Sequence, residues 1–416
     1  MFSFIHCADL HLDSPLRGLS KKEDAPVDEI RLATRRALEN LVDLAVKEGV
    51  DFVLIAGDVY DGDWQDYSTG LFFNSCMARL RERGIPVYLI RGNHDAASNI
   101  TRRLVLPDNV TEFPVDRPAT VTIEDLRVAI HGQGYKEREV WTNLAAGYPD
   151  PVPGYFNIGL LHTSLEGAEG HERYAPARAE ELVQKGYDYW ALGHIHKRQV
   201  VRENPYIVFP GNIQGRHVRE TGEKGCTLVK VDGSAVSVEH RPLDVLRWQV
   251  CSVDLTDAET IGDFAGRVEE ALSALAAENP GYPLAVRVEL FGRTPLYRTI
   301  LQDRDRFFHE IVNAGQMMNA DIWIEKVKFH TEPPEERGRA ASGKDALSAF
   351  RRNIDGEPDE GLIREFLRDV KAVQAKLGAY IRREDATRVE TEEDLEPLLQ
   401  DAREYIFALL TKGGRP

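Results

Sequence analysis

The chain has few cysteines and no long apolar run. Its four cysteines are scattered over 416 residues and form no C-x-x-C pair, which argues against a disulfide framework and favours a reducing cytoplasm. No apolar run approaches the ~20 residues that a membrane span needs. The N-terminal segment lacks a basic start and reaches Asp9 after a short apolar run, unlike a secretory signal. We therefore expect a cytoplasmic protein with no membrane partner.

Positive charge is also scarce, and the formal net charge is -16. This balance argues against a protein that coats nucleic acid through a broad basic face. It leaves room for a local cationic site, such as a metal cluster, because bound cations partly neutralise the acidic residues around them. The length of 416 residues predicts two or three domains, and a hydrophobic share of 42% is typical of a globular protein.

Five apolar runs in the first 240 residues each end in a polar cluster. The runs are FSFI, DFVLIA, IPVYLI, FNIGLL and DYWAL. Continuous apolar runs are typical of strands that are buried on both faces, so helices must cover the sheets. The spacing of apolar residues predicts helices over residues 27–48 and 68–83. Residues 1–240 are therefore expected to form one α/β domain.

The rhythm changes after residue 240. Residues 241–332 read as strand, helix, strand, helix and strand, which predicts a small separate α/β domain. Residues 333–344 are polar and contain Pro and Gly, as expected of a linker. Residues 345–416 are expected to be helical, with a last element that begins near Asp394 and carries an apolar stripe.

One segment nearly matches a phosphate-binding loop. The stretch GRAASGKD, from Gly338 to Asp345, fits the pattern G-x-x-x-x-G-K-[ST] except at its last position. Asp345 replaces the hydroxyl that would bind magnesium, and no buried strand leads into the segment. We therefore expect a linker here and no ATP binding.

The polar clusters supply ligand atoms for a transition metal. They hold two carboxylates, one amide oxygen and four imidazoles, from Asp9, His11, Asp58, Asn93, His162, His194 and His196. The carboxyl ends of strands open a crevice in α/β sheets. Residues i and i+2 of a strand share a face, so each D-x-H or H-x-H pair can converge. Ligation by N and O without thiolate favours manganese, iron or zinc, and seven ligands suit two ions bridged by a carboxylate, ~3.5–4 Å apart.

The ordered motifs DLH, GDVYD, GNHD, HTS and GHIH match a known pattern. Over about the first 200 residues, the chain resembles the calcineurin-like metallophosphoesterases. The resemblance implies a sandwich of two mixed β-sheets flanked by helices, followed here by a small α/β capping domain and a helical C-terminal tail.

The resemblance also implies a role for each ligand. One metal would be held by Asp9, His11, Asp58 and His196, and the second by Asp58, Asn93, His162 and His194. His94 would lie nearest the scissile phosphate as a general acid or transition-state stabiliser, and Asp95 would orient the ring of His94. The glycine turn at Gly92 would place Asn93 on the metal and His94 on the substrate.

Other polar residues have less specific settings. Asp13 and Asp61 each follow a ligand motif and fit either a supporting role beside a ligand or a solvated loop. His6 and Cys7 are expected to pack in or beside the first strand. His131 and His171 are candidates for substrate contact.

The loop of residues 210–225 is rich in glycine and basic residues. Its side chains suit contact with a phosphate backbone, and they equally suit an ordinary surface loop. The candidates for substrate binding there are Arg216, His217 and Arg219, with Lys224 nearby.

Within the family, the layout is most similar to the SbcD-type DNA repair nucleases and their YhaO-like branch. The similarity lies in HCADLHLDSPLRG, the loop PGNIQGRH…TGEKG, the small domain and the helical tail. It implies manganese-dependent exonuclease and single-strand endonuclease cleavage of DNA, while the ligand types leave Fe²⁺ or Zn²⁺ as alternative metals. It also implies homodimerisation and a tail that docks on an SbcC-like coiled-coil ATPase.

Two alternatives stay open. One is a small-molecule or nucleotide phosphodiesterase or phosphatase on the same fold, although about 170 residues beyond the core carry no nucleotide-pocket motif. The other is a catalytically silent binding subunit, which the intact His94 and the complete ligand set disfavour.

Overall fold

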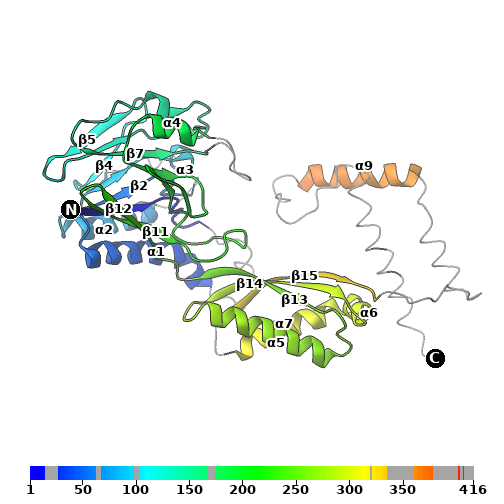
Figure 1. Cartoon of the computed structure of the whole chain (residues 1–416). Coiled ribbons are helices and arrows are strands. Elements are labelled where there is room, and N and C mark those ends of the chain that lie inside the picture. The colour runs from blue at the N-terminus through cyan, green and yellow to red at the C-terminus, as the bar shows by residue number, and fades with distance from the viewer. Residues whose placement is uncertain are drawn as a thin grey trace, which may run out of the picture. The chain divides into compact units, whose positions relative to one another are not determined.

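The computed structural model describes residues 1–14, 27–61, 67–97, 104–165, 174–318, 321–334 and 360–377, together with Ala402 and Ile406. The chain divides into two compact units (Figure 1). The first comprises Met1–Cys251, Ser273–Val288 and Gly315–Lys326, and the second comprises Ser252–Leu272, Glu289–Ala314 and Val327–Pro416. Within the described ranges, no helix combines the length and apolarity that crossing a membrane requires.

The first sheet is mixed and has six strands in the order β12-β11-β1-β2-β3-β4. Four of them run parallel: β1 (Phe2–Cys7), β2 (Phe52–Ile55), β3 (Val87–Leu89) and β4 (Val110–Glu112). Antiparallel strands extend the sheet beyond β1: β11 (Gly225–Asp232) and β12 (Ala235–Pro242). The carboxyl ends of β1, β2 and β3 therefore lie at one edge.

The second sheet is also mixed, in the order β5-β6-β7-β8-β10-β9. Its parallel strands are β6 (Val128–Gly132), β7 (Phe156–His162), β8 (Tyr189–Gly193) and β10 (Tyr206–Phe209). The antiparallel strands at its two borders are β5 (Ala119–Ile123) and β9 (Gln199–Glu203). β7 and β8 thus end side by side.

The alternation of side chains along β1 shows how the two sheets pack. Phe4 lies between the sheets, with its ring 4.9 Å from that of Phe52 and 5.4 Å from that of Tyr189. His6 faces the same way and contacts the Tyr189 hydroxyl at 3.0 Å, so the expected packing role of His6 is confirmed. Ile5 points to the opposite face and packs under the helices.

Helices cover the outer faces. α1 (Val27–Glu48) and α2 (Tyr67–Arg81) lie side by side against the first sheet (Figure 1). α4 (Ala179–Gln184) packs Leu182 against Trp190 of the second sheet. Short elements are α3 (Asn93–Ala97), η2 (Glu124–Leu126) and η3 (Leu144–Gly147). The predicted helix over 27–48 is confirmed, and the second prediction is displaced by one or two residues.

A third sheet has the order β13-β14-β15. Its strands are β13 (Arg247–Asp254), β14 (Leu284–Arg293) and β15 (Ile322–Glu332), and its helices are α5 (Ile261–Glu278), α6 (Tyr297–Gln302) and α7 (Arg304–Met317). Near the C-terminus, α9 spans Glu360–Leu377. The expected fold class, with two mixed sheets, a small α/β region and a helical tail segment, is confirmed.

Parts of the expected organisation lie beyond these elements. The segment Gly338–Asp345 and most of the element expected to begin near Asp394 fall outside the described residues. The boundaries 1–240, 241–332, 333–344 and 345–416 stay predictions.

Candidate metal centre

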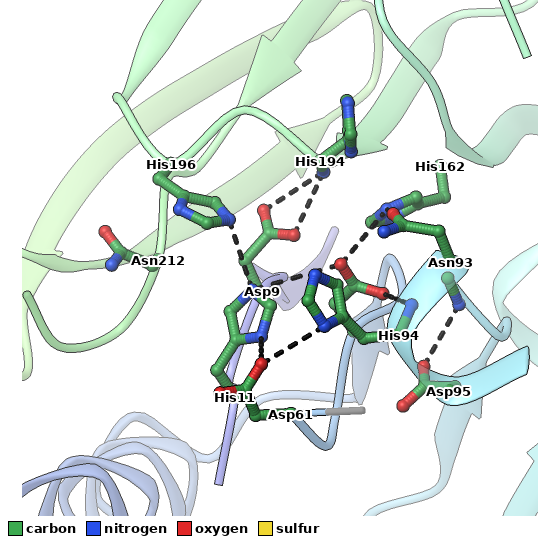
Figure 2. A network of polar contacts seen from close by, with 12 residues as sticks. Asp9, His11, Asp61, Asn93, His94, Asp95, His162, His194, His196 and Asn212 are labelled. Atoms are coloured by element: carbon green, nitrogen blue, oxygen red, sulfur yellow. Dashed lines mark hydrogen bonds and ion pairs between the residues drawn. The ribbon is translucent and has the colours of Figure 1, made fainter. Parts of the chain in front are cut away.

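The polar clusters meet where the strands of both sheets end (Figure 2). Three groups of side chains each bring their ligand atoms within 4.8 Å of one another. The first group is Asp9, His11 and His196, the second is Asp58, His162 and His194, and the third is His11, Asp58 and His94. The structure therefore gathers side chains that lie far apart in the chain.

The backbone at four of these positions is left-handed. The φ angles are 53° at Asp9, 42° at His11, 53° at Asp58 and 99° at His194. Such values are rare for residues other than glycine and tend to occur at functional sites. They also correct the expectation from strand alternation, because these residues follow the strands. Asp9 and His11 still share one group, whereas His194 and His196, also two positions apart, belong to different groups.

Gly92 is needed for a close approach, which differs from the expected turn. A Cβ atom at Gly92 would lie 2.2 Å from Oδ1 of Asp58 and 2.7 Å from the Asp58 backbone nitrogen. Its φ is not among the positive ones of the chain. Only glycine lets the start of α3 come this close to Asp58.

In the first group, two imidazoles face each other. Nε2 of His11 lies 3.1 Å from Nε2 of His196, and both rings are largely buried. Nδ1 of His11 is buried and has no hydrogen-bond partner among the residues that the structure describes. The Asp9 carboxylate accepts the backbone N–H of His194 at 3.0 and 3.1 Å. Two facing nitrogens beside a carboxylate fit a cation-binding site.

In the second group, atoms with lone pairs converge on His162. Its Nδ1 is 2.8 Å from the Ala56 carbonyl, which can only accept, so Nδ1 carries the hydrogen. The remaining Nε2 lies 3.0 Å from Oδ1 of Asn93 and 3.4 Å from Oδ2 of Asp58. Either a proton or a cation must sit among these acceptors, so the donor set fits a metal ion.

The electrostatics of the centre show the same need for positive charge. Burial raises the pKa of Asp9 to about 7. Burial acts in the same direction on Asp58, but the charge and hydrogen bond of His162 outweigh it and hold the pKa of Asp58 well below its usual range. Burial lowers the pKa of His162, yet Asp58 outweighs it and the pKa rises to about 9. The raised pKa keeps a proton on His162, and a bound divalent ion would supply positive charge in place of that proton.

His94 belongs to the third group, lies beside the first two, and is held by Asp61. Nδ1 of His94 is 3.1 Å from Oδ1 of Asp61, and the His94 side chain is 30% exposed. Burial lowers the pKa of His94, but the bond to Asp61 and the charge of Asp58 raise it overall. A bound cation would oppose this rise. The sequence allows two settings for Asp61, and the structure agrees with the first: Asp61 holds a histidine of the centre, His94, and does not lie in a solvated loop.

The expectation that Asp95 orients the ring of His94 is not met. Asp95 accepts backbone N–H groups from Val59, Tyr60 and Gly92 at 3.2, 3.0 and 3.0 Å. It occupies the third position of α3, where an acidic side chain reaches back to the residue that caps the helix. Asp95 therefore fixes α3 against the loop after β2.

Glu220 supports His196 and is absent from the sequence-based candidates. Its Oε1 lies 2.7 Å from Nδ1 of His196, and its side chain is 6% exposed. Nη2 of Arg216 is also 3.1 Å from this nitrogen, but the carboxylate is closer and can only accept. Nδ1 therefore carries the hydrogen and Nε2 faces the centre. The sequence signal that could have identified Glu220 is an acidic residue in a loop that was otherwise expected to bind phosphate.

We expect Glu220→Gln to weaken Mn²⁺ binding by ~10–100-fold, because an uncharged partner holds the imidazole of a metal ligand less firmly. Titration calorimetry with Mn²⁺ measures the change, and circular dichroism checks the fold. The matched control is Glu239→Gln, whose side chain is 60% exposed on β12. Equal Mn²⁺ affinity in Glu220→Gln and wild type would contradict this assignment.

Three of the four predicted substrate-binding residues are described, and they differ in their distance from the centre and in their exposure. Arg216 binds Glu220 through Nη2 at 3.0 Å, while its Nη1 lies 3.9 Å from Asp61 at the centre. His217 is half-buried, with Nε2 3.6 Å from Glu220. Arg219 is exposed, and its backbone N–H donates to Nδ1 of His217. His171 lies outside the described residues.

Two other candidates have structural partners. His131 is buried, contacts Thr120 and Asn157 at 2.8 and 3.0 Å, and stacks on Tyr187, so it does not line the centre. Asp13 binds the guanidinium of Arg35 at 2.7 and 2.6 Å and thereby ties the loop after β1 to α1.

Comparisons with known proteins agree with this geometry. The family model of the calcineurin-like phosphoesterases matches residues 2–198, and that of "Metallophosphoesterase YhaO, middle domain" matches residues 248–332. The Bacillus subtilis (strain 168) protein named "Uncharacterized metallophosphoesterase YhaO" is 38% identical over 338 residues, which is 79% of this chain and 82% of the relative.

More distant relatives are also found. The "DNA double-strand break repair protein Mre11" of Sulfurisphaera tokodaii is 25% identical over 60% of this chain and 65% of its own length. Among solved structures, TT1561 of Thermus thermophilus covers 57% of this chain and 98% of its own, with 13% identity and a TM-score of 0.35. The identity and coverage of the Bacillus protein and the two matching models decide the family: the chain belongs to the YhaO family of calcineurin-like metallophosphoesterases.

Proposed function

We propose that this phosphoesterase is a two-metal DNA phosphodiesterase, an SbcD-like exonuclease and endonuclease in DNA repair. The observation that carries the phosphodiesterase part is the pair of His/Asp groups joined through Asp58, with His94 beside them. The first metal is assigned to Asp9, His11, Asp58 and His196, and the second to Asp58, Asn93, His162 and His194. The proposed metal is Mn²⁺, as the resemblance to the SbcD-type nucleases implies; nitrogen and oxygen ligands suit it and equally suit Fe²⁺ or Zn²⁺.

Bound there, two divalent ions would supply charge neutralisation and an activated water. The side chains of the protein would supply the proton transfer and the positioning. His94 is held through Nδ1 by Asp61, which leaves Nε2 to donate a proton to the departing oxygen or to stabilise the transition state. Asp95 keeps α3 in place, so that His94 and Asn93 stay fixed relative to Asp58.

The substrate contacts are proposed for the loop of residues 210–225. Arg216 has Nη1 directed to Asp61 while Glu220 holds the rest of its guanidinium, which suits contact with a phosphate oxygen beside the metals. His217 and Arg219 follow on the same loop, and His171 keeps its proposed role. The acidic chain, with its net charge of -16, would then hold DNA through few local contacts.

DNA as substrate is supported by the distant relatives, one of which is named a DNA double-strand break repair protein. From the resemblance to the SbcD-type nucleases we also propose a homodimer and an SbcC-like coiled-coil ATPase as partner, docked on residues 345–416. The small α/β domain would cap the site. The alternative is a small-molecule or nucleotide phosphodiesterase or phosphatase on the same fold, since two-metal hydrolysis does not by itself select DNA.

One experiment separates these activities. Purified protein with Mn²⁺ is incubated with end-labelled duplex DNA, single-stranded DNA and bis(p-nitrophenyl) phosphate, and a matched sample contains EDTA. Metal-dependent cleavage of DNA is the expected result. Cleavage of the aryl ester alone, even with an SbcC-type ATPase added, would favour the small-molecule activity. If none of the three substrates is cleaved, the proposed phosphodiesterase activity is wrong.

A further inference from the structure

An aromatic path leads from the metal centre to the protein surface. The ring of Tyr174 lies 5.8 Å from that of His194, and the indole of Trp141 lies 5.6 Å from Tyr174. Tyr174 is buried, with 4% of its surface exposed, whereas Trp141 is 63% exposed. Two ring spacings therefore separate a solvent-facing indole from an imidazole of the second metal group.

The backbone that carries Trp141 is anchored on both sides. Val140 and Leu144 pack against a buried cluster, and the Ala175 N–H donates to the Val140 carbonyl at 2.6 Å. The members of that cluster are Ala96, Tyr135, Tyr174 and Ala175. Because Val140 and Leu144 pack inward on either side of it, Trp141 is presented outward from an anchored segment.

The same cluster supports the chemistry of the centre. Ala96 belongs to α3, the helix that also carries Asn93 and His94. The Tyr135 hydroxyl donates to the His162 carbonyl at 2.8 Å, and its ring lies 5.4 Å from the His162 imidazole. Trp141 is thus joined to the side of the centre that holds His162 and His194.

We propose that Trp141 is a stacking platform for a nucleobase next to the scissile phosphodiester. This inference rests on the proposed phosphodiesterase and names its substrate class, an unpaired nucleotide of a DNA strand. Two successive ring contacts connect His194 to Trp141, and in a nucleotide the base lies one sugar away from its phosphate. Every base has a π-face, so stacking tolerates any sequence.

Exposure alone would not support this role, because single apolar side chains are common on protein surfaces. Here the exposed ring is the largest aromatic type, on an anchored segment, at the end of a ring path to the metal ligands. Stacking also requires no basic surface. It therefore supplies affinity for DNA that the net charge of -16 denies to a broad electrostatic contact.

The test compares Trp141→Ala and Trp141→Phe with wild type on a labelled single-stranded oligonucleotide in Mn²⁺. Loss of one stacked base corresponds to about 5- to 100-fold in binding. We expect Trp141→Ala to raise KM by that factor and to change kcat little, while Trp141→Phe stays close to wild type. The matched control is Phe366→Ala, which removes a 50% exposed ring on α9 and should leave KM unchanged.

A second series places one abasic residue at successive positions around the cleavage site. At the stacked position, the abasic residue should raise the KM of wild type as much as Trp141→Ala does, and it should add nothing further in that variant. Equal KM values for wild type and Trp141→Ala, or an abasic effect that persists in the variant, would overturn the platform.

A binding measurement keeps the two proposals separable. If wild type cleaves no phosphodiester, the proposed function fails, and quenching of tryptophan fluorescence by the oligonucleotide in Mn²⁺ then decides the platform. Quenching in wild type that is lost in Trp141→Ala supports it. If the aryl ester is cleaved while oligonucleotides neither bind nor react, the phosphodiesterase stands and the platform is wrong.

Discussion

Asp58→Asn is expected to lose both bound metals and, with them, phosphodiester hydrolysis. Oδ2 of Asp58 lies 3.4 Å from Nε2 of His162 and 3.9 Å from Nε2 of His11, so one carboxylate serves both groups. An amide lacks the negative charge that two cations need between them. Removal of a residue that only hydrogen-bonds a metal ligand costs ~10–100-fold in metal affinity. Loss of Asp58, a ligand shared by both metals, should therefore cost more than ~100-fold.

The variant should still fold, which makes the result interpretable. The other carboxylate oxygen of Asp58 accepts the backbone N–H of His94 at 2.9 Å, and an asparagine oxygen can accept the same bond. Metal analysis after dialysis against Mn²⁺ and hydrolysis of bis(p-nitrophenyl) phosphate provide the readouts. The control is Asp43→Asn on α1, where the side chain is 65% exposed. Two tightly bound ions in Asp58→Asn would show that Asp58 is not the shared ligand.

His94→Ala is expected to keep both metals and to lose turnover by ~10²–10⁴-fold, the usual contribution of a positioned acid or base. The ring is tied to Asp61 through Nδ1 and is the most exposed imidazole of the three groups, at 30%, compared with 19% or less for the others. It is therefore free to face a substrate. The kcat for the aryl phosphodiester and the Mn²⁺ content measure the two effects separately.

The two possible failures of this prediction have different meanings. Wild-type turnover in His94→Ala would remove His94 from the chemistry. Loss of one metal would instead make His94 a ligand, as the third group of His11, Asp58 and His94 allows. The control is His309→Ala, which removes an exposed imidazole on α7 and should change neither quantity.

Much of this centre could be predicted because its residues follow buried strands. The apolar runs before Asp9, Asp58 and Asn93 become β1, β2 and β3, which are parallel neighbours. Parallel neighbours end at one edge of a sheet, so the polar residues after them must come together. The same reasoning holds for His162 at the end of β7 and His194 after β8.

The supporting residues could not be predicted in this way. Glu220 reaches His196 from a loop between β10 and β11, and no periodicity in the sequence places that loop. Asp95 and Asp61 differ in role because α3 directs the first to backbone amides and leaves the second beside His94. The resemblance implied Asp95 as the partner of His94, but Asp61 takes that place because Asp95, in the third position of α3, accepts backbone N–H groups.

The sequence by itself determined the kind of chemistry, because the types of ligand atom and the strands that precede them are local properties. Only the tertiary structure decided the backbone geometry at the ligands and the residues that support them. Asp9 and His11 share one group whereas His194 and His196 belong to different groups, although each pair begins with a left-handed residue. Asp58 and His162 come from different sheets and meet because the sandwich core brings the two sheet edges together.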